Sequence, residues 1–329
     1  MDVSLSVWLI LSGVLAFLLV LDFFTVSRKP HDAMFKESLA WSVFYIAVAI
    51  GFGIWVWTTA GAEYGNEFFA AYLVEKSLSV DNLFVFALIF ANFGIPSAYH
   101  QRALLVGVIL ALVFRGAFIA VGAVALNKFA FTFVLFGILL IYTGIKLLRH
   151  WDEDDEPSDN AFVRLVRKLI PVSDELEGNK LFTRKNGKRM ATPMLLVMVA
   201  VAGTDLLFAL DSIPATFGVT EEPFLVFSAN AFALLGLRAL YFLLKGLLDK
   251  IVYLSIGLAV ILMFIGVKLV LIYVHEQYET IPKISTNASL VVIASVLVIS
   301  GIASYFKVRR DPNAHAHSGK ITEVYSEQE

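Results

Sequence analysis

Two segments place carboxylates inside runs that are otherwise long and apolar. The first reads VEKSLSVDNLF from Val74, and the second reads DLLFALDSIPATFGV from Asp205. An ionised side chain near the middle of a bilayer costs about 2.5 to 3.5 kcal/mol on insertion scales, so such groups usually mark an ion pathway or a binding site. The four carboxylates of these segments are Glu75, Asp81, Asp205 and Asp211.

The residue types around the carboxylates predict a site for a hard divalent cation. Asn82 and Asn230 add amide oxygens, and the two intramembrane arginines, Arg115 and Arg238, are expected to act as counter-ions. Four carboxylates then exceed the nearby cations, even if Lys76 is counted. The chain has no cysteine, and its six histidines fall in loops or at span ends. Carboxylate, amide, hydroxyl and carbonyl oxygens favour Mn²⁺, Mg²⁺ or Ca²⁺ over Zn²⁺ or Cu⁺.

Two other interpretations of these charges stay open. The acids and arginines could simply neutralise one another and hold helices together, although buried ion pairs stabilise a fold poorly compared with apolar packing. The arginines could also bind an anionic substrate. Asn230 could equally serve to satisfy a broken backbone, and a methionine such as Met194 or Met198, on roughly the face of Asp205, is more often packing than a ligand.

Helix geometry raises a difficulty for Asp211. On a regular helix Asp205, Ser212 and Thr216 share one face, whereas Asp211 lies on another. Pro214 removes the hydrogen bond to the carbonyl of Leu210. We therefore expect a break between these two residues that turns Asp211 inward and leaves carbonyl oxygens free, as in many transporter sites.

The composition indicates which elements hold these groups. Of the 329 residues, 58% are apolar, against about 45 to 50% in soluble domains, and the mean hydropathy is +0.77. About 20 apolar residues cross a bilayer as a helix. We therefore predict an all-α, polytopic membrane protein with about nine transmembrane helices. The nine apolar runs are 5–26, 38–60, 68–92, 102–126, 130–148, 193–217, 223–244, 251–273 and 287–306.

Internal similarity divides the chain into two repeats of three helices. The segment DNLFVFALIFANFGI from Asp81 aligns without gaps on the segment from Asp205, and GIKLL from Gly144 later aligns on GVKLV from Gly266. Because three spans reverse the chain, the repeats have opposite orientations in the membrane. The predicted organisation is two N-terminal transmembrane helices (1–67), a first repeat (68–148), a cytoplasmic linker (149–192), a second repeat (193–273), a last transmembrane helix (274–310) and a flexible cytoplasmic tail (311–329).

The distribution of basic residues predicts the orientation. Nine basic residues lie between Arg149 and Arg189, and the other set of loops is marked instead by acidic residues such as Glu63 and Glu221. By the positive-inside rule, the N-terminus is outside and the C-terminus is cytoplasmic.

Four motifs, in order along the chain, resemble the TerC family of membrane proteins, in particular its Alx-type members. They are EKSLSVDNLFVF, ATPMLL, FALDSIPA and LLGLRALYFLL, and the resemblance runs from about Asp22 to Val270. It implies a bacterial inner-membrane protein associated with manganese efflux and, by name, with tellurium resistance. It also implies that the four carboxylates carry the ion site. The family usually has a Glu three residues before the second-repeat Asp, but Ala202 stands there in this chain.

We therefore expect a secondary transporter that exports a divalent cation, with Mn²⁺ as the favoured ion, by alternating access. The chain has no G-x-x-x-x-G-K-[ST] loop for ATP hydrolysis, so proton or sodium exchange would supply the energy. We expect lipid and the ion as partners, no permanently bound cofactor and no nucleic acid, and the sequence identifies no protein partner. The alternative is a non-transporting scaffold of a metal or tellurite stress-response complex. No span carries H-E-x-x-H, so we do not expect an enzyme.

Overall fold

The computed structural model confirms an all-α architecture. It describes residues 3–27, 35–149, 163–164, 167–168, 170–173, 178, 180–185, 188–244, 252–278 and 284–310, and the side chain of Asp81 lies outside the described part. The helices are α1 (Leu5–Ser27), α2 (Phe35–Ala60), α3 (Ala62–Asn92), α4 (Ser97–Lys128), α5 (Phe131–Arg149), α7 (Pro193–Phe217), α8 (Pro223–Leu235), α9 (Leu237–Leu244), α10 (Leu254–Gln277) and α11 (Thr286–Arg310). Each predicted apolar run contains a helix, and the seventh is the pair α8 and α9.

By length and composition, fewer helices qualify as membrane spans than the nine that we expected. Within the described residues, seven helices are long and apolar enough to cross a bilayer. The pair α8 and α9, bent by 41°, would be an eighth. The long helix α3 is not among them, because it carries Glu63, Glu67, Glu75, Lys76 and Asp81 within its 31 residues. A count of nine therefore stays a prediction.

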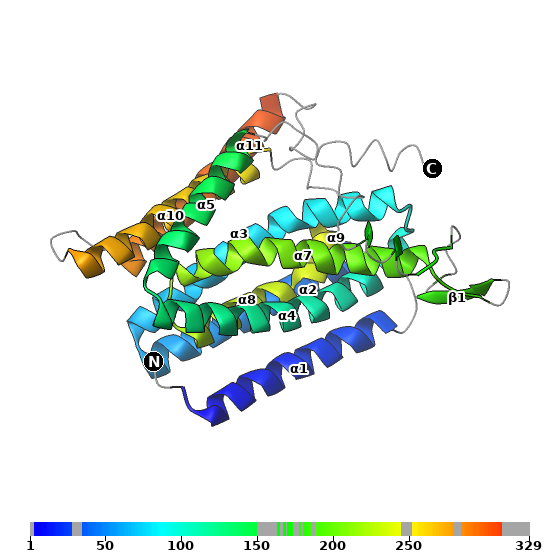
Figure 1. Cartoon of the computed structure of the whole chain (residues 1–329), viewed down its shortest axis with the longest axis horizontal. Coiled ribbons are helices and arrows are strands. Elements are labelled where there is room, and N and C mark those ends of the chain that lie inside the picture. Colours follow the sequence, from blue (N-terminus) through cyan, green and yellow to red (C-terminus); the bar gives the residue numbers. More distant parts are fainter. Residues whose placement is uncertain are drawn as a thin grey trace.

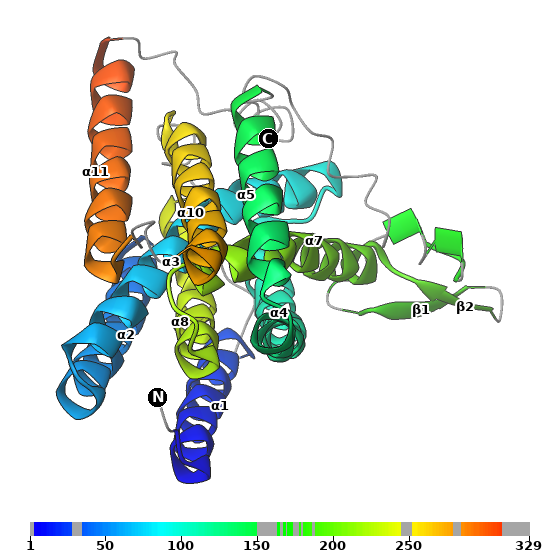
Figure 2. The same ribbon diagram turned by 60° about the vertical axis from the view of Figure 1, so that its left-hand side comes forward.

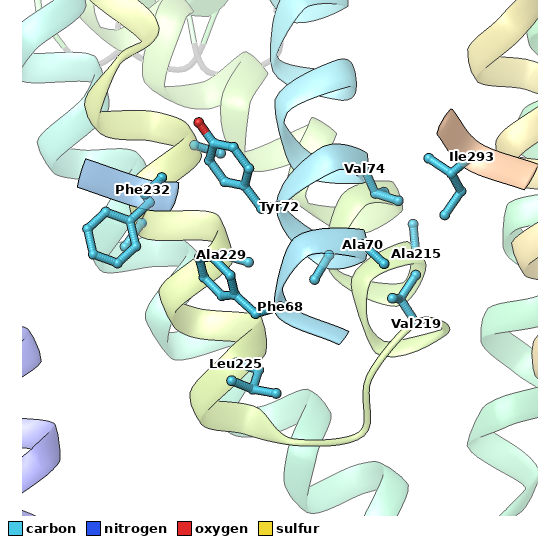
Figure 3. Close-up of a cluster of buried hydrophobic side chains, with 14 of the residues drawn as sticks. Phe68, Ala70, Tyr72, Val74, Ala215, Val219, Leu225, Ala229, Phe232 and Ile293 are labelled. Atoms are coloured by element: carbon cyan, nitrogen blue, oxygen red, sulfur yellow. The ribbon is translucent and has the colours of Figure 1, made fainter. Parts of the chain in front are cut away.

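Helix α3 lies in the interior of the bundle (Figure 1). It packs against α2, α7, α8 and α11. In Figure 3, Phe68 of α3 lies beside Ala229 of α8, and Val74 lies on the other side of α3, toward Ile293 of α11. Glu75 is fully buried among these neighbours, and Glu67 and Lys76 are half-buried, which explains how a helix of this composition lies among apolar ones.

Helices α5, α10 and α11 stand side by side in Figure 2, and α5 and α10 approach very closely. A Cβ atom on Gly137 would lie 2.7 Å from the carbonyl oxygen of Gly266, and one on Gly144 would lie 2.9 Å from the carbonyl oxygen of Ala259. Small residues permit such contacts between membrane helices. In the repeat alignment Gly144 corresponds to Gly266, and Gly137 corresponds to Ala259. The symmetry of the repeat would therefore place the contact between Gly137 and Gly266 on the contact between Ala259 and Gly144. The packing agrees with the predicted repeat, which stays a prediction.

The expected break in α7 is absent. The helix continues from Pro193 to Phe217 with Pro214 inside it. Pro214 lies only one turn before the end of the helix, so the hydrogen bond that it cannot donate to Leu210 lies within the last two turns. The break falls instead at Gly236, between α8 and α9. Beside Gly236, the ammonium group of Lys76 donates a hydrogen bond to the carbonyl of Ala233 at 3.3 Å.

The predicted linker 149–192 is described in part, and it contains a feature that the sequence analysis missed. Strands β1 (Phe182–Lys185) and β2 (Lys188–Ala191) pair antiparallel and form a hairpin immediately before α7. The predicted tail 311–329 lies outside the described residues.

Candidate ion site

A fully buried arginine joins the two acidic segments. Arg115, from α4, donates from Nη1 to Oε2 of Glu75 on α3 at 2.7 Å. Its Nε and Nη2 donate to Oδ2 and Oδ1 of Asp205 on α7 at 3.1 and 3.2 Å. The exposed fractions are 0% for Glu75, 1% for Arg115 and 2% for Asp205. The spans of both segments therefore converge on one guanidinium.

Neutral polar groups complete this arrangement. Nη1 of Arg115 also donates to Oδ1 of Asn230 at 2.6 Å and to Oγ of Ser212 at 3.0 Å. Glu75 Oε1 accepts from Nδ2 of Asn230 at 2.9 Å and from Oγ1 of Thr216 at 2.6 Å. Asn230 lies on α8, and all of these side chains are buried. We call the six residues the Arg115 cluster: Glu75, Arg115, Asp205, Ser212, Thr216 and Asn230.

The Arg115 cluster carries more negative than positive charge. Two ionised carboxylates face one guanidinium, so the cluster has a formal charge of −1. Carboxylate oxygens of Glu75 and Asp205, the amide oxygen of Asn230 and the hydroxyl of Ser212 all accept hydrogen bonds from the Arg115 guanidinium. These are the oxygen donors that hard divalent cations prefer. The arrangement can hold a cation, and in this structure Arg115 supplies it.

The cluster is smaller than the site predicted from the sequence. In the part of the chain that the structure describes, no group of three or more Asp, Glu or His side chains is placed to hold a metal. Asn82 is buried on α3, two turns from Glu75, but it does not bond to Arg115. Ala202, at the position of the usual family Glu, is also buried. A metal would therefore have to take the place of the Arg115 guanidinium.

Helical spacing accounts for the members contributed by α7. Asp205, Ser212 and Thr216 lie on one face, as their spacing predicts, and this face meets α3 and α4. Asp211 does not join them, because six residues correspond to about 240° around a helix and no break turns it back. It is half-buried and accepts a hydrogen bond from Oγ1 of Thr143 on α5 at 3.0 Å. We therefore correct the prediction that Asp211 lies with Asp205.

Arg238 belongs to a second buried network. Its Nη2 donates to Oδ1 of Asp22, on α1, at 2.6 Å, and its Nη1 donates to Gln101 at 3.4 Å. Tyr45 of α2 donates to the same Asp22 oxygen at 3.0 Å. Among the side chains that the structure describes, Arg238 is thus the counter-ion of Asp22. Asp22 is the only charged residue in the first apolar run. A lone carboxylate in an apolar helix needs a buried cation, so its pairing with an intramembrane arginine could have been predicted from the sequence.

One histidine is more buried than the sequence suggested. His100, in the first turn of α4, is fully buried, stacks on Phe90 with ring centroids 4.1 Å apart and lies 3.0 Å from the hydroxyl of Tyr241. Its Nε2 is 2.7 Å from the carbonyl oxygen of Ile95. These contacts place the imidazole outside the Arg115 cluster.

Comparison with known proteins agrees with this architecture. Residues 60–311 match the integral membrane protein TerC family. An uncharacterized membrane protein of Myxococcus xanthus is 42% identical over 94% of this chain and 96% of its own length. An uncharacterized membrane protein of Mycobacterium tuberculosis is 43% identical over 99% of this chain and 85% of its own length.

A third relative has a more informative name. A protein of Photorhabdus laumondii described as a candidate membrane-bound redox modulator, Alx, is 37% identical over 90% of this chain and 93% of its own length. No solved structure matches the chain. The family match covers most of the chain, and the apolar helices are those of a multi-pass membrane protein. The chain therefore belongs to the TerC family of integral membrane proteins.

Proposed function

We propose that this protein is a secondary transporter that exports a divalent metal cation, with Mn²⁺ as the favoured ion. The observation that carries the proposal is the convergence of Glu75, Asp205 and Asn230 on one buried cation, the guanidinium of Arg115. Three helices supply these oxygens. A simple ion pair needs one carboxylate for one arginine, whereas two carboxylates converge on Arg115 here.

Charge balance suggests how Arg115 would take part in transport. The two carboxylates carry −2, which a divalent ion would neutralise completely and which Arg115 neutralises only by half. An uncompensated charge in a membrane interior is costly. Arg115 would therefore move aside when the metal binds, and it would return to the carboxylates when the metal leaves.

The origin of the helices supports alternating access as the mechanism. Glu75 and Arg115 come from the predicted first repeat, and Asp205 and Asn230 come from the predicted second repeat. Movement of one repeat against the other would change which side of the membrane reaches the site. Proton or sodium exchange would supply the energy. The proposal places the protein in the bacterial inner membrane, with the N-terminus outside and the C-terminus cytoplasmic, and it includes no resident cofactor and no enzymatic activity.

The name of the Photorhabdus relative suggests a link to redox balance. This chain has no cysteine, so it would not contribute through thiol chemistry of its own. Control of a metal such as Mn²⁺, which itself can change oxidation state, is the route by which a transporter would affect redox balance.

The direct test is Mn²⁺ flux in proteoliposomes with an imposed pH gradient. We expect Glu75→Gln and Asp205→Asn to abolish flux, because each removes a carboxylate from the Arg115 cluster. Asp211→Asn is the matched control, since it removes a carboxylate from the same helix but outside the cluster, and it should retain flux. Equal flux in the wild type and in the Glu75→Gln, Asp205→Asn double variant would contradict the proposal. That outcome would favour a non-transporting scaffold, which does not need these acids.

A further inference from the structure

The β1 and β2 hairpin concentrates positive charge. Its strands are separated by only two residues and pair in register from Phe182 with Ala191 to Lys185 with Lys188. The segment 180–191 contains no Asp or Glu. Its five basic residues are Lys180, Arg184, Lys185, Lys188 and Arg189. A hairpin with this composition attracts an anionic partner.

The hairpin is fixed to the beginning of a membrane helix. Only Thr192 lies between β2 and α7, which begins at Pro193. The backbone N–H of Thr192 donates to the carbonyl of Leu181 at 3.1 Å, and its hydroxyl donates to the carbonyl of Lys180 at 2.6 Å. Thr192 is fully buried. Figure 2 shows the hairpin extending from the end of α7. If α7 crosses the bilayer, the hairpin has to lie at the level of the lipid headgroups.

Three of the basic side chains line a cavity that is open to the surface. It has a volume of about 600 Å³ and is lined by Lys180, Phe182, Thr183, Arg184 and Arg189. Lys180, Arg184 and Arg189 are exposed. The guanidinium carbon of Arg189 lies 4.1 Å from the centroid of the Phe182 ring, a cation–π contact that orients this side chain. Among the described residues, the lining therefore has three cationic groups and one hydroxyl, and no carboxylate.

We propose that this cavity binds the headgroup of an anionic phospholipid. Arginine recognises phosphate oxygens through paired N–H groups, and lysine adds a point charge. Basic residues beside a membrane helix are attracted to anionic lipid. The lipid is favoured over a soluble phosphate because the one-residue connection to α7 holds the cavity at the membrane surface. The bound lipid would tie the linker between the two predicted repeats to the bilayer.

The test uses the purified full-length protein in detergent, titrated with phosphatidylglycerol or with phosphatidylcholine and followed by native mass spectrometry. Each basic residue near a membrane surface contributes about fivefold in binding, so Arg184→Ala with Arg189→Ala should weaken phosphatidylglycerol binding roughly 30-fold. Phosphatidylcholine binding should not change. The matched control is Arg309→Ala with Arg310→Ala, at the end of α11, which removes the same charge from two other exposed positions.

A second variant distinguishes a loss of lipid contacts from misfolding of the hairpin. Lys180→Ala with Arg184→Ala leaves the contact between Arg189 and Phe182 in place and should cause a similar loss. Unchanged phosphatidylglycerol affinity in both hairpin variants would overturn the proposal, and so would an equal loss in the α11 control. Displacement of the lipid by millimolar inorganic phosphate would identify a soluble anion as the ligand and would also overturn it. The proposal depends on α7 crossing the membrane and not on metal transport, so it can fail or succeed independently of the proposed function.

Discussion

Replacing Arg115 with methionine tests whether the guanidinium occupies the position of the transported ion. Methionine keeps an unbranched chain about as long as the aliphatic part of arginine but has no charge. Both carboxylate oxygens of Asp205 accept their hydrogen bonds from Arg115, whereas Glu75 would keep those from Asn230 and Thr216. The substitution thus leaves two buried carboxylates without a cation.

The destabilisation by Arg115→Met can be estimated from the loss of this cation. Removing one partner of a buried ion pair costs about 3 to 5 kcal/mol, which is a large part of an ordinary folding free energy of about 5 to 15 kcal/mol. A divalent ion that binds between the carboxylates would restore part of it. At a free concentration of about 100 times Kd, the stabilisation is about 2.7 kcal/mol.

The assay is thermal unfolding of the detergent-purified protein, measured with EDTA and with increasing MnCl₂. We expect Arg115→Met to unfold at a lower temperature than the wild type in EDTA and to recover half of the loss or more with Mn²⁺. The unfolding temperature of the wild type should rise less with Mn²⁺, because the metal must first displace Arg115.

The matched control is Arg238→Met. It removes an equally buried guanidinium from a carboxylate, that of Asp22, so it should be destabilised by a comparable amount. It should not recover with Mn²⁺, since Asp22 is the one carboxylate that contacts Arg238 among the described side chains. Equal responses of the two variants to Mn²⁺ would refute the idea that the Arg115 cluster holds a metal.

Three further predictions concern the cluster and the helices around it. Asn230→Ala removes a donor to Glu75 and an acceptor from Arg115, so unfolding should become easier by about 1 to 3 kcal/mol; an unchanged denaturation midpoint would contradict these contacts. Ala202→Glu introduces the carboxylate usual in the family, and isothermal titration should show tighter Mn²⁺ binding if that side chain reaches the site. Over-packing a core usually costs about 1 to 3 kcal/mol. Gly266→Leu should destabilise the protein by more than that, because the leucine Cβ would lie 2.7 Å from the carbonyl oxygen of Gly137. Gly301→Leu, where no atom lies within 4 Å, should leave the thermal midpoint unchanged.

Much of the local structure was predictable from the sequence alone. The apolar runs determined where the helices lie, because a helix of about 20 apolar residues satisfies its own backbone in lipid. Helical periodicity also determined that Asp205 shares a face with Ser212 and Thr216, and the four motifs determined the family.

The choice of partners was decided by the tertiary structure. The sequence contained two intramembrane arginines and several acids, but only the packing of the helices assigned Arg115 to Glu75 and Asp205, and Arg238 to Asp22, which is 216 positions away. Packing also left Asp211 facing Thr143. Periodicity relates a residue to the axis of its own helix, whereas an ion pair depends on which neighbouring helix that face meets, and this is determined by the apolar packing of the whole bundle.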